Sequence, residues 1–252
     1  MARLDGRVII VTGGAQGIGK VYCQGLAREG AKVVVADIDG SLAERTAEEL
    51  GAAEALPVTT DVSQLEGTER MVKATLDQFG RIDGLVNNAA VFQRPSVKRG
   101  PFEEISVEEW DRVMAVNVRG TFLCCRAVLP QMKQQRYGKI VNISSGTVFS
   151  GTPRFAHYVT SKAAVIGLTR CIAREVGDFN ICINAVAPGL TLSLDNVDEA
   201  GMEGYKQRAQ TGCIKRVETP QDLVGTIVFL SSAESDFITG QTIAVNGGTA
   251  MI

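Results

Sequence analysis

The stretch that decides the fold is TGGAQGIG, residues 12–19. It follows a short apolar run at residues 8–11 and precedes a segment of helical length. Gly13, Gly17 and Gly19 allow a tight backbone turn that a ligand can approach closely, and the helix that begins there offers free N–H groups and a partial positive charge to an anion. A tight connection between a strand and a helix also uses glycine, so the surrounding sequence has to decide between the two interpretations.

Outward from this turn, short β-branched runs alternate with helix-length segments along nearly the whole chain. The expected strands are residues 7–12, 32–37, 55–59, 82–87, 138–144, 180–187 and 242–245. The runs VIIV at 8–11 and VVVA at 33–36 are continuously apolar, which is typical of parallel strands covered on both faces. The alternation predicts an α/β fold, a Rossmann-type doubly wound parallel sheet of about seven strands. No linker or repeat interrupts it, so residues 1–252 are expected to form a single domain.

Several helices carry start signals. Three serine–glutamate pairs have the spacing of a capping box, and one threonine precedes a proline at the first helical position. These are Ser41 with Glu44, Ser63 with Glu66, Ser106 with Glu109, and Thr219 with Pro220.

The least regular region is residues 190–213, LTLSLDNVDEAGMEGYKQRAQTGC, which is polar and follows a strand end. Ligands of open α/β sheets bind outside the carboxyl ends of the strands, so we expect a substrate lid at about 190–213. A surface excursion without function is the other interpretation.

Composition excludes several classes of protein. The chain has 45% hydrophobic and 21% charged residues and a net charge of −2, so no basic footprint for nucleic acid is present. The aliphatic run at 8–11 is far too short for a signal core or a membrane span. Six cysteines without a CxxC pair and a single histidine disfavour a metal site. We expect a cytoplasmic protein that binds no metal, no nucleic acid and no membrane.

An acid at the end of the second strand points to a nucleotide. Asp37, in VVVADID, is placed to accept hydrogen bonds from both hydroxyls of an adenosine ribose. A 2′-phosphate there would meet like charge, at a cost on the order of 4 kcal/mol for one pair at ~4 Å and an effective dielectric of ~20. Neither Ile38 nor Gln16 supplies a compensating cation. The sequence therefore favours NAD over NADP. Asp61 and Val62 are candidates for the adenine edge, although an N-cap at Ser63 competes for this segment.

Catalytic chemistry is indicated by AHYVTSKAAV, residues 156–165, where Tyr158 and Lys162 lie four residues apart on one helix face. Lowering a phenol pKa from ~10 to ~7 requires roughly 4 kcal/mol. One ammonium at ~4 Å in a partly buried site supplies about that much. A tyrosinate so stabilised can take the proton of an alcohol while a hydride leaves its carbon. Taken alone, the pair is equally consistent with an exposed helix face.

The order of the motifs settles this choice. The glycine turn, the strand-end acid, LVNNAA at 85–90, Ser145 after IVNIS and the YxxxK pair together resemble the short-chain dehydrogenase/reductase family over essentially all 252 residues. The resemblance implies that Tyr158 is the acid–base group and that Ser145 binds the substrate oxygen. It implies that Lys162 holds the nicotinamide ribose and lowers the Tyr158 pKa, and that Asn117 anchors a water in a proton relay.

The resemblance also implies the contacts of the ligands and the assembly state. The expected NAD contacts are Gly13, Gln16, Gly17, Ile18, Gly19, Asp37, Ile38, Asp61, Val62, Asn87, Asn88, Ala89, Tyr158, Lys162, Pro188, Gly189, Thr191 and Ser193. The expected substrate contacts are Ser145, Thr147, Phe155, Tyr158 and Leu190. A homotetramer is implied, with the helices of Asn117 and Tyr158 packing across subunits. Ala90, Ser193 and Asn246 depart from the usual glycine, threonine and aspartate of the family without removing a catalytic group.

We therefore expect an oxidoreductase that reversibly oxidises a small-molecule secondary alcohol, cyclic or aromatic, to a ketone with NAD. The alternative is a 3-oxoacyl-thioester reductase using NADPH, and a more distant one is a nucleotide-sensing protein without turnover. A basic cluster after the fourth strand, Arg94, Lys98 and Arg99, is either a binding feature for an acidic substrate or a solvated loop. His157, beside Tyr158, is expected to be a packing residue.

Overall fold

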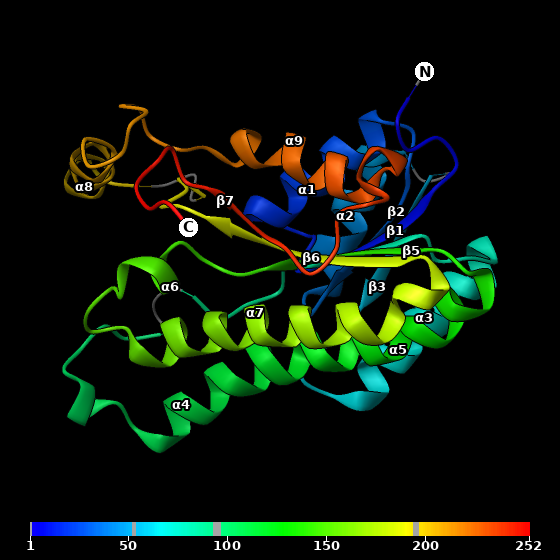
Figure 1. Ribbon diagram of the computed structural model, residues 1–252, viewed down its shortest axis with the longest axis horizontal. Helices are drawn as coiled ribbons and strands as arrows, with labels where there is room; N and C mark the ends of the chain where they lie inside the picture. Colours follow the sequence, from blue (N-terminus) through cyan, green and yellow to red (C-terminus); the bar gives the residue numbers. More distant parts are fainter. Residues whose placement is uncertain (1, 52–53, 93–96, 194–196) are drawn as a thin grey trace.

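The computed structural model describes residues 2–51, 54–92, 97–193 and 197–252, and within them seven strands form one parallel sheet (Figure 1). The order is β3-β2-β1-β4-β5-β6-β7, so the chain reverses its direction of travel between β1 and β4. The strands are β1 (Val8–Thr12), β2 (Lys32–Asp37), β3 (Ala55–Thr59), β4 (Gly84–Asn87), β5 (Gly138–Ile143), β6 (Ile181–Pro188) and β7 (Thr242–Val245). The predicted α/β sheet is confirmed, and β2, β3 and β7 have the predicted bounds.

β4 starts two residues later than the sequence suggested, for a physical reason. The side-chain amide of Gln135 accepts from the Ile82 backbone N–H at 3.0 Å and donates to the Ile82 carbonyl at 2.8 Å. A side chain thus satisfies the backbone groups that a neighbouring strand would otherwise bond, and the ladder begins only at Gly84.

Helices cover both faces of the sheet. They are α1 (Gly17–Arg28), α2 (Gly40–Leu50), α3 (Leu65–Phe79), α4 (Val107–Met114), α5 (Thr121–Gln135), α6 (Thr147–Ser150), α7 (Ala156–Val176), α8 (Glu199–Ala209) and α9 (Pro220–Ser231). A π-helical turn, Ala115–Gly120, joins α4 to α5, and three-residue 3₁₀ turns occur at Phe102–Glu104, Gly177–Phe179 and Ala233–Ser235.

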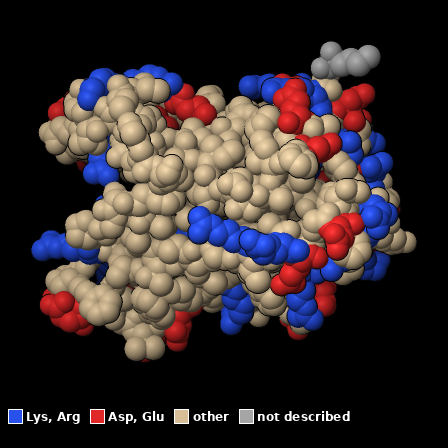
Figure 2. All heavy atoms as spheres, viewed as in Figure 1, with Lys and Arg blue, Asp and Glu red and all other residues tan. Residues whose placement is uncertain are grey.

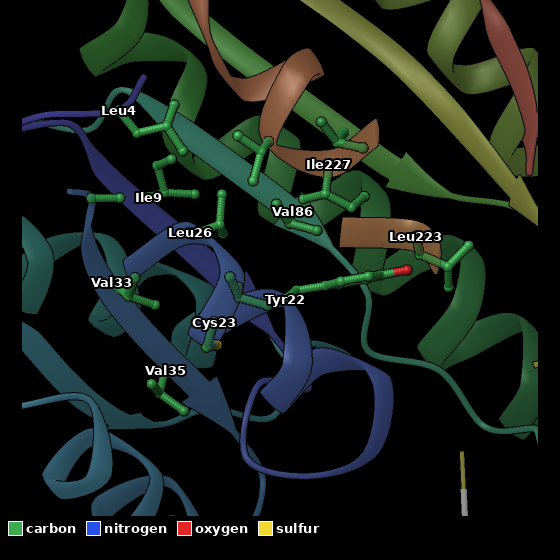
Figure 3. Packing of buried hydrophobic residues seen from close by; sticks show 14 of the residues in the cluster. Leu4, Ile9, Tyr22, Cys23, Leu26, Val33, Val35, Val86, Leu223 and Ile227 are labelled. Atoms are coloured by element: carbon green, nitrogen blue, oxygen red, sulfur yellow. The ribbon is translucent and has the colours of Figure 1, made fainter. Parts of the chain in front are cut away.

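Successive side chains of the central strands alternate between two cores. Ile9 and Val11 of β1 pack with residues of α1, α2 and α9 (Figure 3), whereas Val8 and Ile10 pack with residues of α3, α5 and α7. Because successive residues of a strand point to opposite faces, a run of four aliphatic residues serves both cores.

The predicted helix starts are right at two of four positions. Ser106 accepts from the Glu109 N–H and begins α4, and Thr219 begins α9 with a full capping box completed by Asp222. The other two are wrong. The N-cap of α2 is Asp39, whose carboxylate accepts from the Leu42 N–H, so Ser41 lies inside the helix. Ser63 does not cap α3 but donates to Asp61, because that carboxylate closes the preceding turn.

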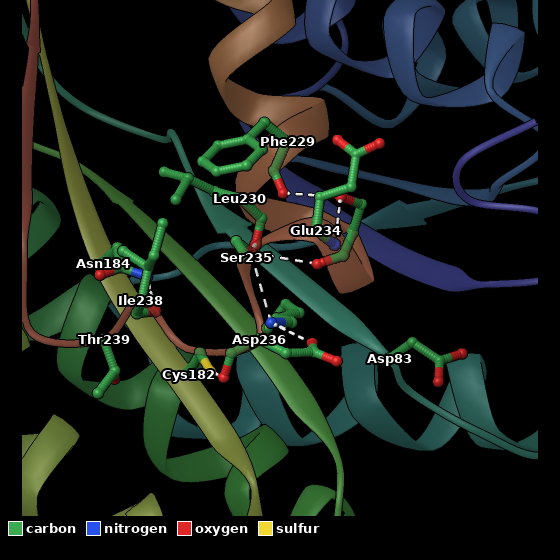
Figure 4. A network of polar contacts seen from close by, with 12 residues as sticks. Asp83, Cys182, Asn184, Phe229, Leu230, Glu234, Ser235, Asp236, Ile238 and Thr239 are labelled. Atoms are coloured by element: carbon green, nitrogen blue, oxygen red, sulfur yellow. Dashed lines mark hydrogen bonds and ion pairs between the residues drawn. The ribbon is translucent and has the colours of Figure 1, made fainter.

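Buried charges organise the amino-terminal edge of the sheet, opposite the carboxyl ends. The buried Lys139 ammonium, at the start of β5, lies 2.7 Å from Asp236 and 3.4 Å from the Ser235 hydroxyl (Figure 4). The buried Asp83 accepts from the Val8 N–H at 2.9 Å and from Arg81 at 2.6 and 2.8 Å. These contacts fix where β1, β4 and β5 begin and leave the opposite edge to the loops.

Charges of both signs are interspersed over the visible surface in Figure 2, and a recess separates two lobes at the end where α8 lies. The continuous helical stretch Val107–Gln135 is long and apolar enough to cross a membrane by length and composition, with a mean hydropathy of 1.2. Core helices of globular proteins pass the same test, and α5 packs its buried residues into the core between α3, α7 and the sheet.

Candidate active site

The glycine turn lies at the carboxyl end of β1 and opens α1. Gly13 and Gly17 have φ of +62° and +54°, a region that favours glycine. A Cβ on Gly19 would overlap the Gly13 carbonyl oxygen, and one on Gly13 would lie 2.9 Å from the Ala89 Cα. The backbones after β1 and β4 therefore approach each other too closely for side chains.

The N-terminus of α1 has donors to offer. Its N-cap, Gln16, makes no side-chain capping bond, and the first turn contains no acid. The first N–H groups of a helix have no partner within it, and they attract an anion. The residues present therefore fit a dinucleotide pyrophosphate, and the contacts expected from Gly13, Gln16, Gly17, Ile18 and Gly19 stay predictions.

Thr12 and Asn88 fix this turn to β4. The Thr12 hydroxyl accepts from the backbone N–H groups of Asn88 and Ala89, each at 3.1 Å. In return, the Asn88 side-chain amide donates to the carbonyls of Thr12 and Gly13 at 3.1 and 3.0 Å. Asn88 thus stabilises the central strands, as the resemblance implied. Asn87 points into the core instead, where its amide donates to Asn142 at 2.8 Å.

Asp37 ends β2 beside the turn and is 6% exposed. One carboxylate oxygen accepts from the Ala15 N–H at 3.1 Å and the other from the Asp39 N–H at 3.2 Å. Each oxygen keeps a further lone pair, so the group is held in place and can still accept from a ligand. Ile38 is 70% exposed beside it and brings no positive charge.

Asp61 and Val62 lie at the carboxyl end of β3, but only part of their expected role fits. One Asp61 oxygen accepts from both the N–H and the hydroxyl of Ser63, at 2.9 and 2.7 Å. Val62 is buried and packs in the core shared with α3 and α5. The local turn, more than a ligand, accounts for Asp61 in this structure.

Tyr158, Lys162 and Ser145 meet at the carboxyl end of β5. Tyr158 and Lys162 lie in the first half of α7, both buried, and the Lys162 ammonium is 5.7 Å from the centre of the Tyr158 ring. The ammonium donates to the Ile143 carbonyl at 2.8 Å, which leaves two of its N–H bonds for other partners. The Ser145 hydroxyl acts to lower the pKa of the Tyr158 phenol and accepts from the Thr147 N–H and hydroxyl at 3.2 and 3.0 Å.

Burial shifts the pKa values of both Tyr158 and Lys162. Burial raises the pKa of Tyr158, and the groups that act against it are the Ser145 hydroxyl and the positive charge of Arg99, not Lys162. Burial lowers the pKa of Lys162 to about 8. Burial thus opposes the charged form of both groups in the protein without its cofactor, and the lowering of the Tyr158 pKa by Lys162 stays a prediction for the complex with the cofactor.

Asn117 lies in the π-helical turn between α4 and α5 and is buried. Its side chain accepts from the Val91 N–H at 2.9 Å and donates to the Val91 carbonyl and the Ser161 hydroxyl, at 3.3 and 3.0 Å. A π-helical turn often marks a functional position. Here it ties the segment after β4 to α7, the helix that carries Tyr158, and among its described contacts none is with Lys162.

Pro188 ends β6, and the residues after it cross toward the glycine turn. The backbone oxygen of Ser193 lies 3.6 Å from where a Cβ on Gly17 would be. Thr191 forms an isolated bridge to Glu218 and donates its hydroxyl to the Glu218 carboxylate at 2.7 Å. The structure thus brings Ser193 beside the predicted pyrophosphate site, whereas Thr191 contacts Glu218.

Comparisons with known proteins identify the family. A family model described as Enoyl-(Acyl carrier protein) reductase matches residues 13–250. Subunit BbsD of the (2S)-[(R)-hydroxy(phenyl)methyl]succinyl-CoA dehydrogenase from Thauera aromatica is 37% identical over 252 residues, which cover 98% of each chain. The chain is a short-chain dehydrogenase/reductase.

Further relatives of this short-chain dehydrogenase/reductase carry another printed activity. A 3-oxoacyl-[acyl-carrier-protein] reductase from Thermotoga maritima is 38% identical over 253 residues and 98% of each chain. The crystal structure of 3-ketoacyl-(acyl-carrier-protein) reductase from Brucella melitensis complexed with NADH matches with a TM-score of 0.89 at 31% identity, covering 98% of this chain and 100% of that one. The predicted family is confirmed, and the protein is an oxidoreductase.

In this short-chain dehydrogenase/reductase, three of the predicted substrate contacts, Thr147, Phe155 and Leu190, have different surroundings. Thr147 bonds Ser145 directly. Phe155, 1% exposed, instead stacks on the Tyr158 ring at 4.6 Å, so it supports the phenol more than it offers a wall to a substrate. Leu190 lines a separate recess with Tyr205 of α8, Ile214 and Asn246. Residues 190–193 and 197–213 contain α8 where a lid was expected; residues 194–196 lie outside the described structure.

The sequence analysis did not predict the role that three supporting residues have at the site. Thr12 stands directly before the glycine turn, which is a signal that could have indicated its role. Glu218 had none, because only the fold brings it to Thr191. Glu109 accepts from the Lys98 N–H at 2.6 Å and lies 3.1 Å from the His157 ring nitrogen. His157 is fully buried, as expected for a packing residue.

Proposed function

We propose that this short-chain dehydrogenase/reductase oxidises a secondary alcohol, cyclic or aromatic, to a ketone with NAD, reversibly, and that it does so in the cytoplasm. The observation that carries the proposal is a buried phenol whose pKa Ser145 acts to lower, one helical turn from Lys162 and at the same sheet edge as the glycine turn. The relative from Thauera aromatica supports it, because its printed name contains a hydroxy(phenyl)methyl group, an aromatic secondary alcohol.

The residues divide the work as follows. Ser145 orients the substrate hydroxyl, and Tyr158 takes its proton. Bound NAD supplies the hydride acceptor. The Lys162 ammonium, with two donors beyond its bond to Ile143, holds the ribose and stabilises the tyrosinate once a cationic nicotinamide adds its charge. Because burial raises the pKa of Tyr158 in the free protein, we expect ionisation of the phenol to depend on cofactor binding.

Preference for NAD rests on Asp37. Its carboxylate is fixed by the Ala15 and Asp39 N–H groups, and exposed Ile38 beside it brings no cation to a 2′-phosphate. A fixed negative charge there repels that phosphate and accepts the hydroxyls of an unmodified ribose. In assays with a panel of cyclic, aromatic and aliphatic secondary alcohols, NAD should give a higher kcat/KM than NADP. Better turnover with NADP would contradict the cofactor assignment.

The assigned base is tested with Tyr158→Phe. We expect loss of turnover with NAD affinity retained in calorimetry, because the ring stays packed on Phe155 and only the hydroxyl is lost. Tyr137→Phe is the matched control, since this half-buried phenol stacks against Arg7, away from Tyr158. Unchanged kcat in the Tyr158 variant would refute the assignment.

A second candidate is reduction of a 3-oxoacyl thioester, favoured by the printed names of the Thermotoga and Brucella relatives. Oxidation of NADH or NADPH with a 3-oxoacyl-CoA, measured beside the alcohol panel, decides between the two. A kcat/KM for the thioester that exceeds every alcohol or ketone tested would establish the second candidate.

We also propose a homotetramer in which α4, α5 and α7 pack across subunits. Phe122 of α5 is 45% exposed and lines a shallow recess with Met114 and Val118, an apolar surface suited to a partner copy. Light scattering should give the mass of four chains, and Phe122→Glu should shift it to a smaller species. A monomer for the unmodified protein would contradict the proposal.

A further inference from the structure

The segment that follows the undescribed residues 93–96 is held at three points. Val97 is 2% exposed in a small apolar cluster with Phe155 and Tyr158. The Lys98 N–H donates to the Glu109 carboxylate at 2.6 Å. The Gly100 N–H donates to the Arg154 carbonyl at 3.2 Å. A residue between such anchors has a defined position although its side chain is exposed.

That residue is Arg99, and its guanidinium rests on the aromatic cluster around the proposed base. The Arg99 Cζ lies 4.4 Å from the centre of the Phe155 ring. The other face of Phe155 stacks on Tyr158, with ring centres 4.6 Å apart and planes inclined by 18°. The cation is therefore one aromatic ring away from Tyr158, held by a cation–π contact.

The charge of Arg99 is available to a ligand. No carboxylate among the described residues forms an ion pair with it, whereas Arg3, Arg7, Arg81 and Arg216 each have one. Glu109, which anchors this segment, is occupied by the Lys98 N–H and His157, and a Glu104 carboxylate oxygen lies 3.9 Å from where a Cβ on Gly100 would be, without forming an ion pair with Arg99. A planar guanidinium is well suited to a carboxylate, which it binds through two parallel N–H bonds.

The charge of Arg99 also acts on a residue of α8. Burial raises the pKa of the Tyr158 and Tyr205 phenols, and in both cases the positive charge of Arg99 acts in the opposite direction. Tyr205 belongs to α8, so the charge of Arg99 acts both on the cluster around Tyr158 and on this helix. At this end of the molecule, Figure 2 shows Lys and Arg atoms on both lobes that flank the recess.

We propose that Arg99 determines substrate specificity by binding a carboxylate, so that the preferred substrate is a secondary alcohol that carries a carboxylate a few carbon atoms from the carbinol. The inference rests on the proposed function and names its substrate class. Phe155 holds the guanidinium at a fixed height above Tyr158, and the distance between cation and phenol selects the spacing of the two substrate groups.

The test uses three forms of one substrate: 3-hydroxy-3-phenylpropanoate, its methyl ester and its coenzyme A thioester, each assayed for NADH formation. The unmodified enzyme should prefer the acid to the ester. Arg99→Gln should lower the acid-to-ester ratio of kcat/KM on the order of tenfold or more, mainly through KM of the acid. Arg99→Lys, which keeps the charge, should restore part of the ratio. Lys98→Gln is the matched control, because it removes a neighbouring exposed charge and leaves the backbone anchor to Glu109 intact; its ratio should equal that of the unmodified enzyme.

Three outcomes would overturn the proposal. An ester used as well as the acid would show that the charge is not recognised. An Arg99→Gln variant with an unchanged ratio would show that another group recognises it. An effect restricted to the thioester would locate the anion on coenzyme A instead. Turnover of neutral alcohols without turnover of the acid would refute this inference alone, whereas no turnover of any alcohol with NAD would refute the proposed function.

Discussion

Replacing Lys162 with methionine tests the electrostatics of the site directly. Lys162 is 3% exposed, and burial lowers its pKa from 10.5 to about 8. Between these two values the unfolded chain binds more protons than the folded protein, so the free energy of unfolding rises with pH through this window. The charged lysine therefore destabilises the folded protein below pH 8, and this penalty disappears as pH approaches 10.5.

The magnitude follows from the size of the shift. At about 1.4 kcal/mol per pKa unit, the penalty is about 3 kcal/mol at pH 7. Lys162→Met removes it, and under the proposed function the variant should lose activity because the cation proposed to hold the ribose is gone. The absolute difference in stability also includes the Ile143 carbonyl left without its donor, a cost of about 1 to 3 kcal/mol. The cost of the unpaired carbonyl does not depend on pH, so the test uses the change of the stability difference with pH.

The assay is urea unfolding of both proteins without cofactor, at a fixed protein concentration, from pH 7 to pH 10. The stability of the Lys162→Met variant relative to the unmodified protein should fall by about 2 to 3 kcal/mol over this range. Lys206→Met is the control, because this exposed lysine loses little hydration on folding and should show no such change. If the stability of the Lys162→Met variant relative to the unmodified protein stays constant or rises from pH 7 to pH 10, the reasoning is refuted.

Three further substitutions test the framework of the site. Gly19→Ala puts a methyl group into the carbonyl of Gly13 and should weaken NAD binding at least tenfold in calorimetry; affinity within twofold of the original would show that the turn is not under this constraint. Asp83→Ala leaves the buried Val8 N–H without its acceptor, and urea unfolding should show a loss of about 2 to 4 kcal/mol; a loss below 1 kcal/mol would contradict the structural role. Glu218→Ala removes the acceptor of the Thr191 hydroxyl, in the segment predicted to bind the cofactor, and should raise KM for NAD severalfold, whereas Glu218→Gln should restore it. Equal KM values in the unmodified protein and both variants would refute that role.

Local sequence predicted most of the fold because its signals are short-range. The apolar runs at 8–11 and 33–36 give strands covered on both faces, and three strands match to the residue. Errors arose where a side chain other than the expected one took the bonds, distant in one case and two residues away in the others. Gln135 takes the backbone groups of Ile82, so β4 starts late, and Asp39 and Asp61 provide the caps or turns that Ser41 and Ser63 were expected to form.

The same distinction applies to the site. The glycine turn, Asp37 and the Tyr158–Lys162 pair could be recognised from the sequence because each depends on spacing within one turn, strand or helix. Phe155 was predicted as a substrate contact, yet it lies stacked between Tyr158 and Arg99. The lowered pKa of Lys162 and the raised pKa of Tyr158 come from burial, which depends on everything packed around them.

The sequence by itself determined the family, the parallel sheet and the identity of the acid–base candidates, because strand period, helix spacing and glycine conformation act over a few residues. Tertiary structure alone decided that Asn117 ties the segment after β4 to α7, that Glu218 reaches Thr191, and that Arg99 stands over the ring that supports Tyr158. These contacts join residues 26 to 56 positions apart in the chain, and whether such groups meet depends on how helices and loops pack at one edge of the sheet.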